Sequence, residues 1–227
     1  MTELSSLGMD RRRLLASAAV ASLLALPGCA SIGSLSLVDA VRRLLELSTQ
    51  RAFASLTAPD GFWNSAVARI DLPVLFGKRG GIIQGILSSD AFREKLQHRL
   101  NNFAERGARR AAPVVADAVR TIGIENAVAI LRGGPTSATS FLRDGMGPGL
   151  VNAMIPELED AMRIANDPIL GQALALLAGV NIGDAAKALA LDADNAIWYE
   201  IGAAEADIRK NPEQTNDPVL IAAFKTL

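Results

Sequence analysis

Apolar side chains recur every three or four residues along most of the chain, which is the spacing of one face of an α-helix. The alternation of apolar and polar residues that marks a half-buried β-strand is nowhere long enough to make a sheet. The pattern therefore predicts an all-α fold, a single irregular multi-helix bundle. Helices are expected over residues 36–56, 90–122, 124–132, 136–144, 149–165, 168–183 and 184–210, with a short terminal helix from Asp217.

Proline and glycine interrupt this pattern. Residues 70–73 should be extended, because a residue that precedes proline is disfavoured in the helical region. Residues 73–87 are ambiguous, since four glycines weaken an otherwise apolar helix. The helix from Asp90 either continues through Pro113 with a kink or restarts there. The uncharged run at 168–183 is too short and too polar to span a bilayer, so we expect it to form the central buried helix.

The N-terminal segment has the pattern of an export signal. Arginines occupy positions 11–13, an uncharged apolar run follows at 14–26, and Cys29 comes shortly after it. The run is shorter than the about 20 apolar residues that a membrane-spanning helix needs. A basic segment, a short apolar segment and small residues at the cut together define a secretory signal.

Two details of this segment indicate how it is used. Arg11 and Arg12 lie in DRRRLL at 10–15, which resembles the signal of the twin-arginine export route. The sequence LPGC at 26–29 resembles a bacterial lipobox, in which Cys29 is acylated and becomes the mature N-terminus. The alternative is a soluble exported protein in which Cys29 is incidental.

The lipobox interpretation divides the chain into three parts. A signal peptide is expected over 1–28, a short tether over 29–34 and one helical domain over 35–227. Acyl chains contribute about 0.8 kcal/mol per buried CH₂, so they hold a soluble domain at a membrane without a spanning helix. We therefore expect the protein on the periplasmic side of the cell envelope, anchored in the inner or the outer membrane.

The amino-acid composition excludes several classes of binding site. The formal net charge of −1 gives no global electrostatic reason to bind nucleic acid. A single cysteine excludes an internal disulfide framework and any zinc site with several thiolates. The single histidine, His98, argues against a histidine-based metal cluster. We expect no metal, no cofactor and no nucleic acid partner.

No familiar catalytic motif is present. A Ser-His-Asp triad would need His98, but this residue lies opposite the apolar stripe through Leu96 and Leu100, so we expect it to be solvated and without a catalytic role, which would need a positioned partner. The acidic run at 192–195 fails as a calcium loop, because apolar residues stand where the later ligands and the glycine belong. Glu205 and Arg209 are four residues apart, which is typical of an ordinary surface ion pair. No catalytic residue is therefore assigned.

Several segments together resemble the bacterial family called domain of unknown function 4197, whose members are commonly predicted lipoproteins. The resemblance covers residues 35–225 and weakens at 77–85, where the family is more plainly helical. It implies one helical domain and export, and it carries over no catalytic residue. The segments that carry it are DGFWN at 60–64 with IDLP at 70–73, LNNFAE at 100–105 with AP at 112–113, IENAVAILRG at 124–133, ATSFLR at 138–143, and AEADIRKNP at 204–212 with Phe224.

Two classes of function remain. The first is a non-enzymatic envelope lipoprotein that binds or scaffolds, with an envelope protein or an apolar small molecule as its partner in addition to the membrane. The alternative is a periplasmic hydrolase or transferase that works with carboxylates and arginines. Convergence of charged residues in one concave pocket would favour the alternative. The candidate residues, all in segments that carry the resemblance, are Asp60, Arg132, Arg143, Glu205 and Arg209.

Overall fold

The computed structural model describes residues 28–72, 89–176 and 180–226. These residues form helices and no β-strand, which confirms the predicted all-α multi-helix bundle. The predicted signal over 1–28, with Arg11 and Arg12, and the ambiguous segment 73–87 lie outside the described residues, apart from the backbone of Gly28.

The helices follow one another with short connections. They are α1 (Gly28–Leu56), α2 (Gly61–Asn64), α4 (Asp90–Thr121), α5 (Ala127–Arg132), α6 (Ser137–Met146), α7 (Gly149–Ala165), α8 (Pro168–Leu176), α9 (Ile182–Lys210), the 3-10 turn η2 (Pro212–Thr215) and α10 (Pro218–Thr226). The predicted tether at 29–34 lies within α1, which is one helix from Gly28.

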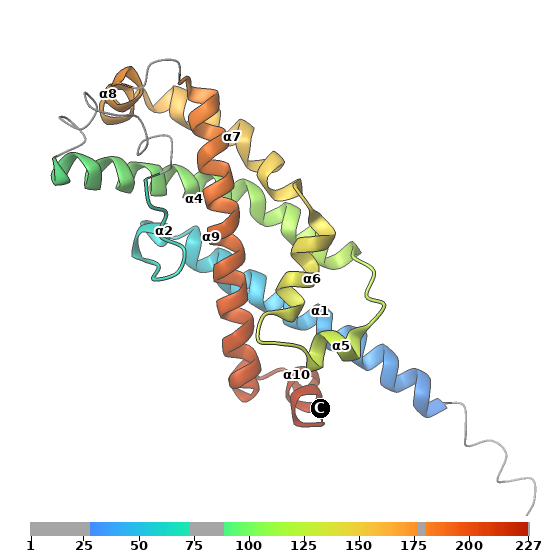
Figure 1. The fold of residues 1–227 in the computed structure, drawn as a ribbon. Coiled ribbons are helices and arrows are strands. Elements are labelled where there is room, and N and C mark those ends of the chain that lie inside the picture. Colours follow the sequence, from blue (N-terminus) through green and yellow to red (C-terminus); the bar gives the residue numbers. More distant parts are fainter. Residues whose placement is uncertain (1–27, 73–88, 177–179, 227) are drawn as a thin grey trace, which may run out of the picture.

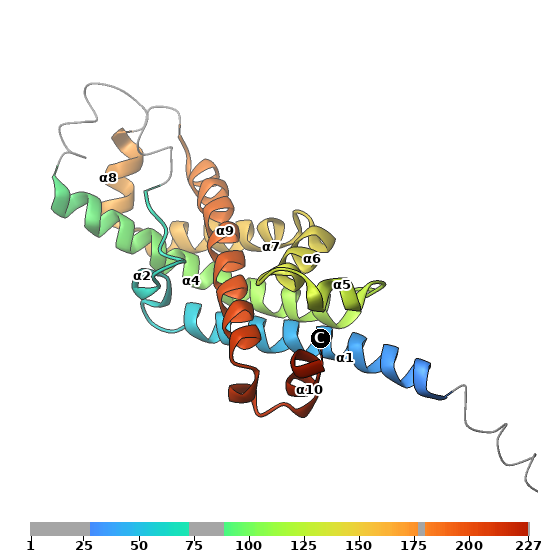
Figure 2. The same ribbon diagram turned by 60° about the horizontal axis from the view of Figure 1, so that its bottom comes forward.

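Four long helices build the core. Helix α1 packs against α4 and α9, and α7 packs against the same two helices from another side. Figure 1 shows α9 crossing the bundle, with α8 near one end and α10 near the other. Figure 2 shows α1 and α4 side by side beneath α9. The core side chains are mainly leucine and alanine, and small residues permit close approach: a Cβ on Gly107 of α4 would lie 3.1 Å from Leu158 of α7.

The helix ends follow local capping rules. Asn181 and Asp184 form a reciprocal capping box at the start of α9, and Asn126 accepts a hydrogen bond from the backbone of Ala129 at the start of α5. Pro113 does not end a helix: α4 runs from Asp90 to Thr121 with the proline inside it. Of the two alternatives left open by the sequence, a continued helix is therefore the observed one.

The expected central helix at 168–183 is wrong. Helix α8 ends at Leu176 and α9 begins at Ile182, so this run does not form one element. Helix α8 lies at the end of the bundle against α4, and Gly171, Gln172 and Ala175 are exposed. The apolar character of residues 168–183 suggested a central helix. The glycines and polar residues in the same run fit the observed position of α8 at the end of the bundle better.

None of the helices in the described parts of the chain is both long enough and apolar enough to cross a membrane.

Candidate functional site

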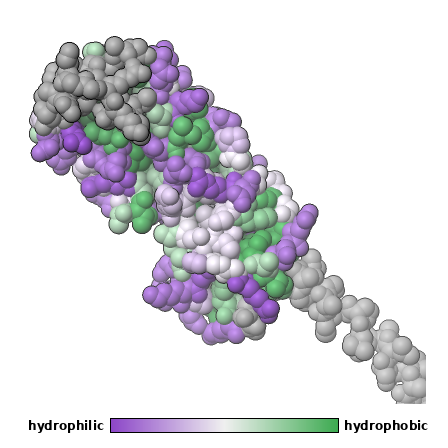
Figure 3. Space-filling view, viewed as in Figure 1, coloured by the Kyte–Doolittle hydropathy of each residue, from purple (hydrophilic) through white to green (hydrophobic). Residues whose placement is uncertain are grey.

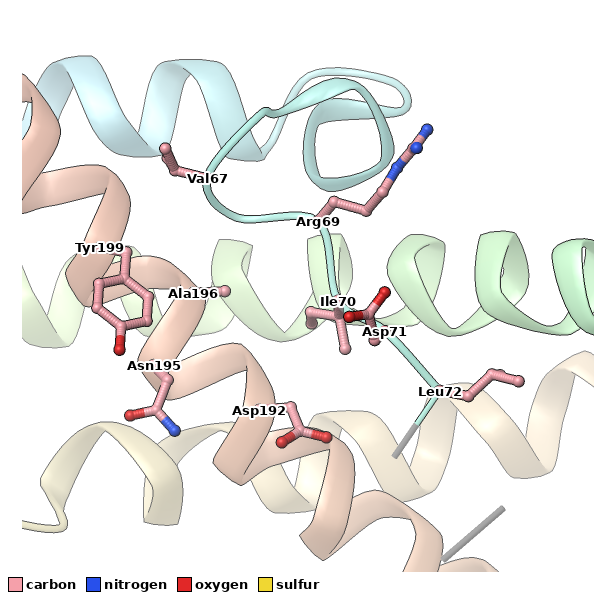
Figure 4. Close-up of a pocket in the computed structure, with 9 residues that line it drawn as sticks. All are labelled: Val67, Arg69, Ile70, Asp71, Leu72, Asp192, Asn195, Ala196 and Tyr199. Atoms are coloured by element: carbon pink, nitrogen blue, oxygen red, sulfur yellow. The ribbon is translucent and has the colours of Figure 1, made fainter. Parts of the chain in front are cut away.

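A pocket of about 310 Å³ lies between the extended segment after α2 and one face of α9 (Figure 4). Both apolar and polar side chains line it, and Val67 and Tyr199 at its walls are 49% and 64% exposed. Two exposed large side chains with apolar surface thus lie beside one concave site, which makes the pocket the leading candidate site. The lining residues are Val67, Arg69, Ile70, Asp71, Leu72, Asp192, Asn195, Ala196 and Tyr199.

One wall is held in place by Asn101, a residue of α4 that is completely buried. Its Oδ1 accepts a hydrogen bond from Ile70 N at 2.9 Å, and its Nδ2 donates to Ile70 O at 2.8 Å. The side chain thus pairs with both backbone groups of Ile70, as a neighbouring strand would. An extended segment is predicted here from Pro73, but nothing in the sequence indicates that Asn101 holds it.

The same wall is tied to α9 at its start. Ser65 Oγ donates a hydrogen bond to Glu200 Oε2 at 2.9 Å and accepts one from Ala68 N at 3.0 Å. These contacts bring the segment after α2 alongside α9 and leave the pocket between them.

The other wall is a single helical face. Asp192, Asn195, Ala196 and Tyr199 are separated by three, one and three residues, so they lie on the same side of α9. Asn195 is held there because its Oδ1 accepts a hydrogen bond from Arg143 Nη2 at 2.6 Å. The spacing of these residues is visible in the sequence, but the element opposite them is not.

The pocket is negatively charged. Asp192 is partly buried, and this burial raises the pKa of its carboxyl. Asp71, on the opposite wall, accepts a hydrogen bond from Gln97 Nε2 at 3.1 Å. The cation on the wall, Arg69, is turned away in Figure 4: its guanidinium lies 3.9 Å from the ring centroid of Trp63, and its Nε donates to Trp63 O.

A second polar cluster joins the α1–α2 connection to α4. His98 Nε2 lies 2.8 Å from Asp60 Oδ1, and the imidazole meets the Trp63 ring edge-on with 4.8 Å between centroids. His98, which was expected to be solvated, has a side chain that is 36% exposed, and it also has a partner in Asp60. The sequence did not reveal this partner, because the position of Asp60 depends on how α2 packs on α4. Neither His98 nor Asp60 lines the pocket described above.

Glu105, about two helical turns beyond His98 along α4, is a buried carboxyl. Its side chain is 7% exposed, and Oε1 has no hydrogen-bond partner among the described residues. Burial raises the pKa of Glu105, and the attraction of Arg109, whose Nη2 lies 3.8 Å from Oε2, only partly opposes this. Nearby Asp60 raises it further by charge repulsion.

Backbone geometry explains the Asp-Gly pair in this region. Asp60 adopts a left-handed conformation with φ of 57°, which aspartate tolerates better than most residues. A Cβ at Gly61 would lie 2.3 Å from Ser55 O and 2.7 Å from Leu56 O. The tight turn from α1 into α2 therefore requires glycine at 61, because there is no space for a side chain at this position.

Two of the five charged candidates meet in the interior. Glu205 is completely buried and Arg209 is 10% exposed at the side chain, so the predicted surface ion pair is wrong. Glu205 accepts hydrogen bonds from Ala138 N at 3.0 Å and from Thr139 N at 2.7 Å, at the start of α6. Arg209 donates to Leu131 O at 2.7 Å, at the end of α5. The pair joins three helices.

The remaining candidates lie elsewhere. Asp60 contacts His98, and Arg143 Nη2 forms an ion pair with Asp194 Oδ2 at 3.0 Å. Arg132 is exposed at the end of α5. None of the five candidates lines the pocket between the 67–72 segment and α9.

A metal site is not evident either: the described parts of the chain contain no group of three or more His, Cys, Asp or Glu side chains that could hold a metal ion.

Comparison with known proteins gives a family and no activity. A family model described as "Protein of unknown function (DUF4197)" matches residues 31–225. This range includes all the helices, apart from the first turn of α1 and the last residue of α10. Neither the curated proteins nor the solved structures contain a significant match.

Proposed function

The chain belongs to the DUF4197 family, and we propose that it is an exported lipoprotein whose helical domain is a non-enzymatic binding module for a small molecule. In this proposal, Cys29 carries the acyl anchor and the domain faces the periplasm. The support for export lies in the sequence, namely Arg11 and Arg12, the apolar run at 14–26 and the lipobox-like LPGC at 26–29.

The pocket between the 67–72 segment and α9 is the observation that carries the binding function. Its volume of about 310 Å³ is at the lower end of the range of small-molecule sites, which are concave and combine an apolar lining with a few placed polar groups. Val67 and Tyr199 stay exposed beside it, and a ligand would cover them. On the face seen in Figure 3, hydrophobic residues form several separate patches between hydrophilic ones, which favours a pocket ligand over a broad apolar docking surface.

The enzyme alternative has less support. A hydrolase or transferase that uses carboxylates and arginines needs these groups around one substrate. Glu205 and Arg209 are instead engaged with backbone groups of α5 and α6, and Arg143 is engaged with α9. His98 has a carboxylate partner in Asp60, but the pair packs against Trp63 and not against the pocket.

Native mass spectrometry of the protein purified in mild detergent from the membranes of its own cells tests this function. We expect an adduct that survives in the native state and is released on denaturation. Val67→Trp places a large ring at the pocket wall and should lower the adduct fraction about tenfold. Val128→Trp, at a position on α5 that is 42% exposed, is the matched control and should leave the adduct unchanged.

Two results would contradict the proposal. A native mass without any adduct argues against a small ligand and for a protein partner. An adduct that Val67→Trp retains in full would place the ligand outside this pocket.

A further inference from the structure

The charges of the pocket define what kind of ligand it suits. Asp71 and Asp192 stand on opposite walls, on the extended segment and on α9 respectively (Figure 4). Arg69, although it lines the pocket, directs its guanidinium over Trp63 and away from both carboxylates. Two carboxylates therefore line the pocket, and the one cation among the described lining residues, Arg69, is engaged with Trp63 instead of with them.

Asp192 in particular lacks compensation. No described residue forms an ion pair or a hydrogen bond with its carboxylate, whereas its neighbour Asp194 is paired with Arg143 and accepts a hydrogen bond from Trp198 Nε1 at 2.9 Å. Burial raises the pKa of Asp192, and no cation in the described parts of the chain opposes this shift. A partly buried carboxylate without a partner is costly, and a bound cation would remove that cost.

The remaining lining suits the body of an organic cation better than a bare metal ion. Val67, Leu72 and Ala196 offer apolar surface, and Tyr199 offers an exposed aromatic ring. Aromatic rings attract cations through the negative charge of their faces, and apolar walls favour a carbon skeleton. A small hydrated metal ion would gain nothing from these groups.

We propose, building on the binding function above, that the ligand of this pocket is an organic ammonium ion with an apolar body, held by the carboxylates of Asp71 and Asp192 and by the ring of Tyr199. The charge selects the ligand, and the apolar walls receive its hydrocarbon part.

The single tyrosine of the chain provides a reporter at the site. Fluorotyrosine labelling of the full chain in mild detergent places one fluorine NMR signal on Tyr199. The probes are benzylammonium and benzyl alcohol, which have nearly the same shape and differ in charge. We expect benzylammonium to shift the signal with saturation, and benzyl alcohol to bind at least about tenfold more weakly.

Asp192→Asn keeps the size of the side chain and removes the charge. It should weaken benzylammonium binding about tenfold and abolish the preference over benzyl alcohol. Asp117→Asn is the control, because it removes the same charge from a side chain of α4 that is 67% exposed and does not line the pocket. It should leave binding of both probes unchanged.

Any other result of these titrations would contradict the proposal that the ligand is an organic ammonium ion. Equal binding of the two probes, or full binding by Asp192→Asn, would leave a binding pocket that does not select charge. Absence of any shift with benzylammonium would exclude the proposed ligand class. Native mass spectrometry tests the binding function separately, because it detects a bound molecule whatever the charge of that molecule.

Discussion

At the scale of single residues, buried polar side chains shape the surroundings of the pocket. Asn101 replaces the strand partner that the extended segment lacks, since it pairs with both backbone groups of Ile70 and also donates to Gln97 O at 2.8 Å. Loss of this side chain would leave Ile70 N buried without a hydrogen-bond partner. Glu105 is the opposite case, a buried carboxyl whose own oxygen lacks a partner.

Asn101→Ala should lower the free energy of unfolding by about 1–3 kcal/mol, because Ile70 N then stays buried without a hydrogen bond and Ile70 O keeps only the one from Gln97 Nε2 at 3.1 Å. Urea unfolding followed by circular dichroism measures the loss. Asn152→Ala, at an exposed position of α7, is the control and should change stability by no more than about 0.5 kcal/mol. A loss no larger than that of the control would show that Ile70 finds other partners.

Glu105→Gln should be more stable than the wild type at pH 7. The pKa of Glu105 is raised in the folded state, so the folded protein binds more protons than the unfolded chain, and stability falls as the pH rises from the ordinary value of 4.5 through the raised pKa. Glutamine carries no charge, so the difference should vanish below pH 4.5, where the glutamate is protonated in both states.

Urea unfolding at several pH values measures this difference, with Glu125→Gln at an exposed position as the control for charge removal. A Glu105→Gln variant that is less stable than the wild type at pH 7, by a difference that disappears below pH 4.5, would mean that the attraction of Arg109 outweighs the cost of burial.

At the scale of elements, charged side chains of the long helices bind the ends of other helices. Glu205 of α9 accepts the free N–H groups at the start of α6, and Arg209 occupies carbonyl groups at the end of α5. Arg42 of α1 donates to Arg120 O at 2.7 Å and to Ile122 O at 3.3 Å, at the end of α4. Helix ends leave such groups unsatisfied, and their polarity favours an acid at the start and a base at the end.

Glu205→Ala should destabilise the protein by about 3–5 kcal/mol, because it leaves Arg209 as a buried charge and frees the start of α6. The matched control is Glu159→Ala, which removes an i,i+4 partner of Arg163 at 4.0 Å on the surface and should cost about 0–1 kcal/mol. Thermal unfolding of both variants separates the two cases. Equal losses would mean that Glu205 contributes no more than a surface pair.

At the scale of the whole molecule, α1 connects the proposed anchor to the core. It runs without a break from Gly28 to Leu56, and Figures 1 and 2 both show its first turns reaching beyond the other helices. Its later part packs in the centre of the bundle, where Leu44 and Leu45 are completely buried. An acyl chain on Cys29 would thus be joined to the domain through a helix, which is stiffer than an extended tether.

Cys29→Ala should abolish the incorporation of labelled palmitate and move the full chain out of the membrane fraction. The reason is that acyl chains, at about 0.8 kcal/mol per buried CH₂, supply the membrane affinity in the proposed arrangement. Ser31→Ala, two residues away, is the control and should behave like the wild type. A cysteine variant that keeps both the label and the membrane association would contradict the lipobox.

The sequence by itself determined the class of the fold and most of the helices. The helix expected at 149–165 is observed as Gly149–Ala165, and the one expected at 90–122 as Asp90–Thr121. These elements could be predicted because the apolar period of a helix and its capping residues act within a few positions of the chain. The family resemblance over residues 35–225 is likewise a property of the sequence, and the family model confirms it over 31–225.

The tertiary structure alone decided which residues come together and how deeply they are buried. A spacing of four residues is the same for a surface pair and for Glu205 with Arg209, and it is the packing of α5 and α6 on α9 that buries this pair. His98 has Asp60 as a partner because α2 packs on α4.

The pocket also depends on the tertiary structure. The face of α9 from Asp192 to Tyr199 could be predicted from the sequence, but the pocket exists because Asn101 and Ser65 hold a segment more than a hundred residues earlier against this face. Contacts between distant segments depend on the packing of the whole chain, which local periodicity does not encode.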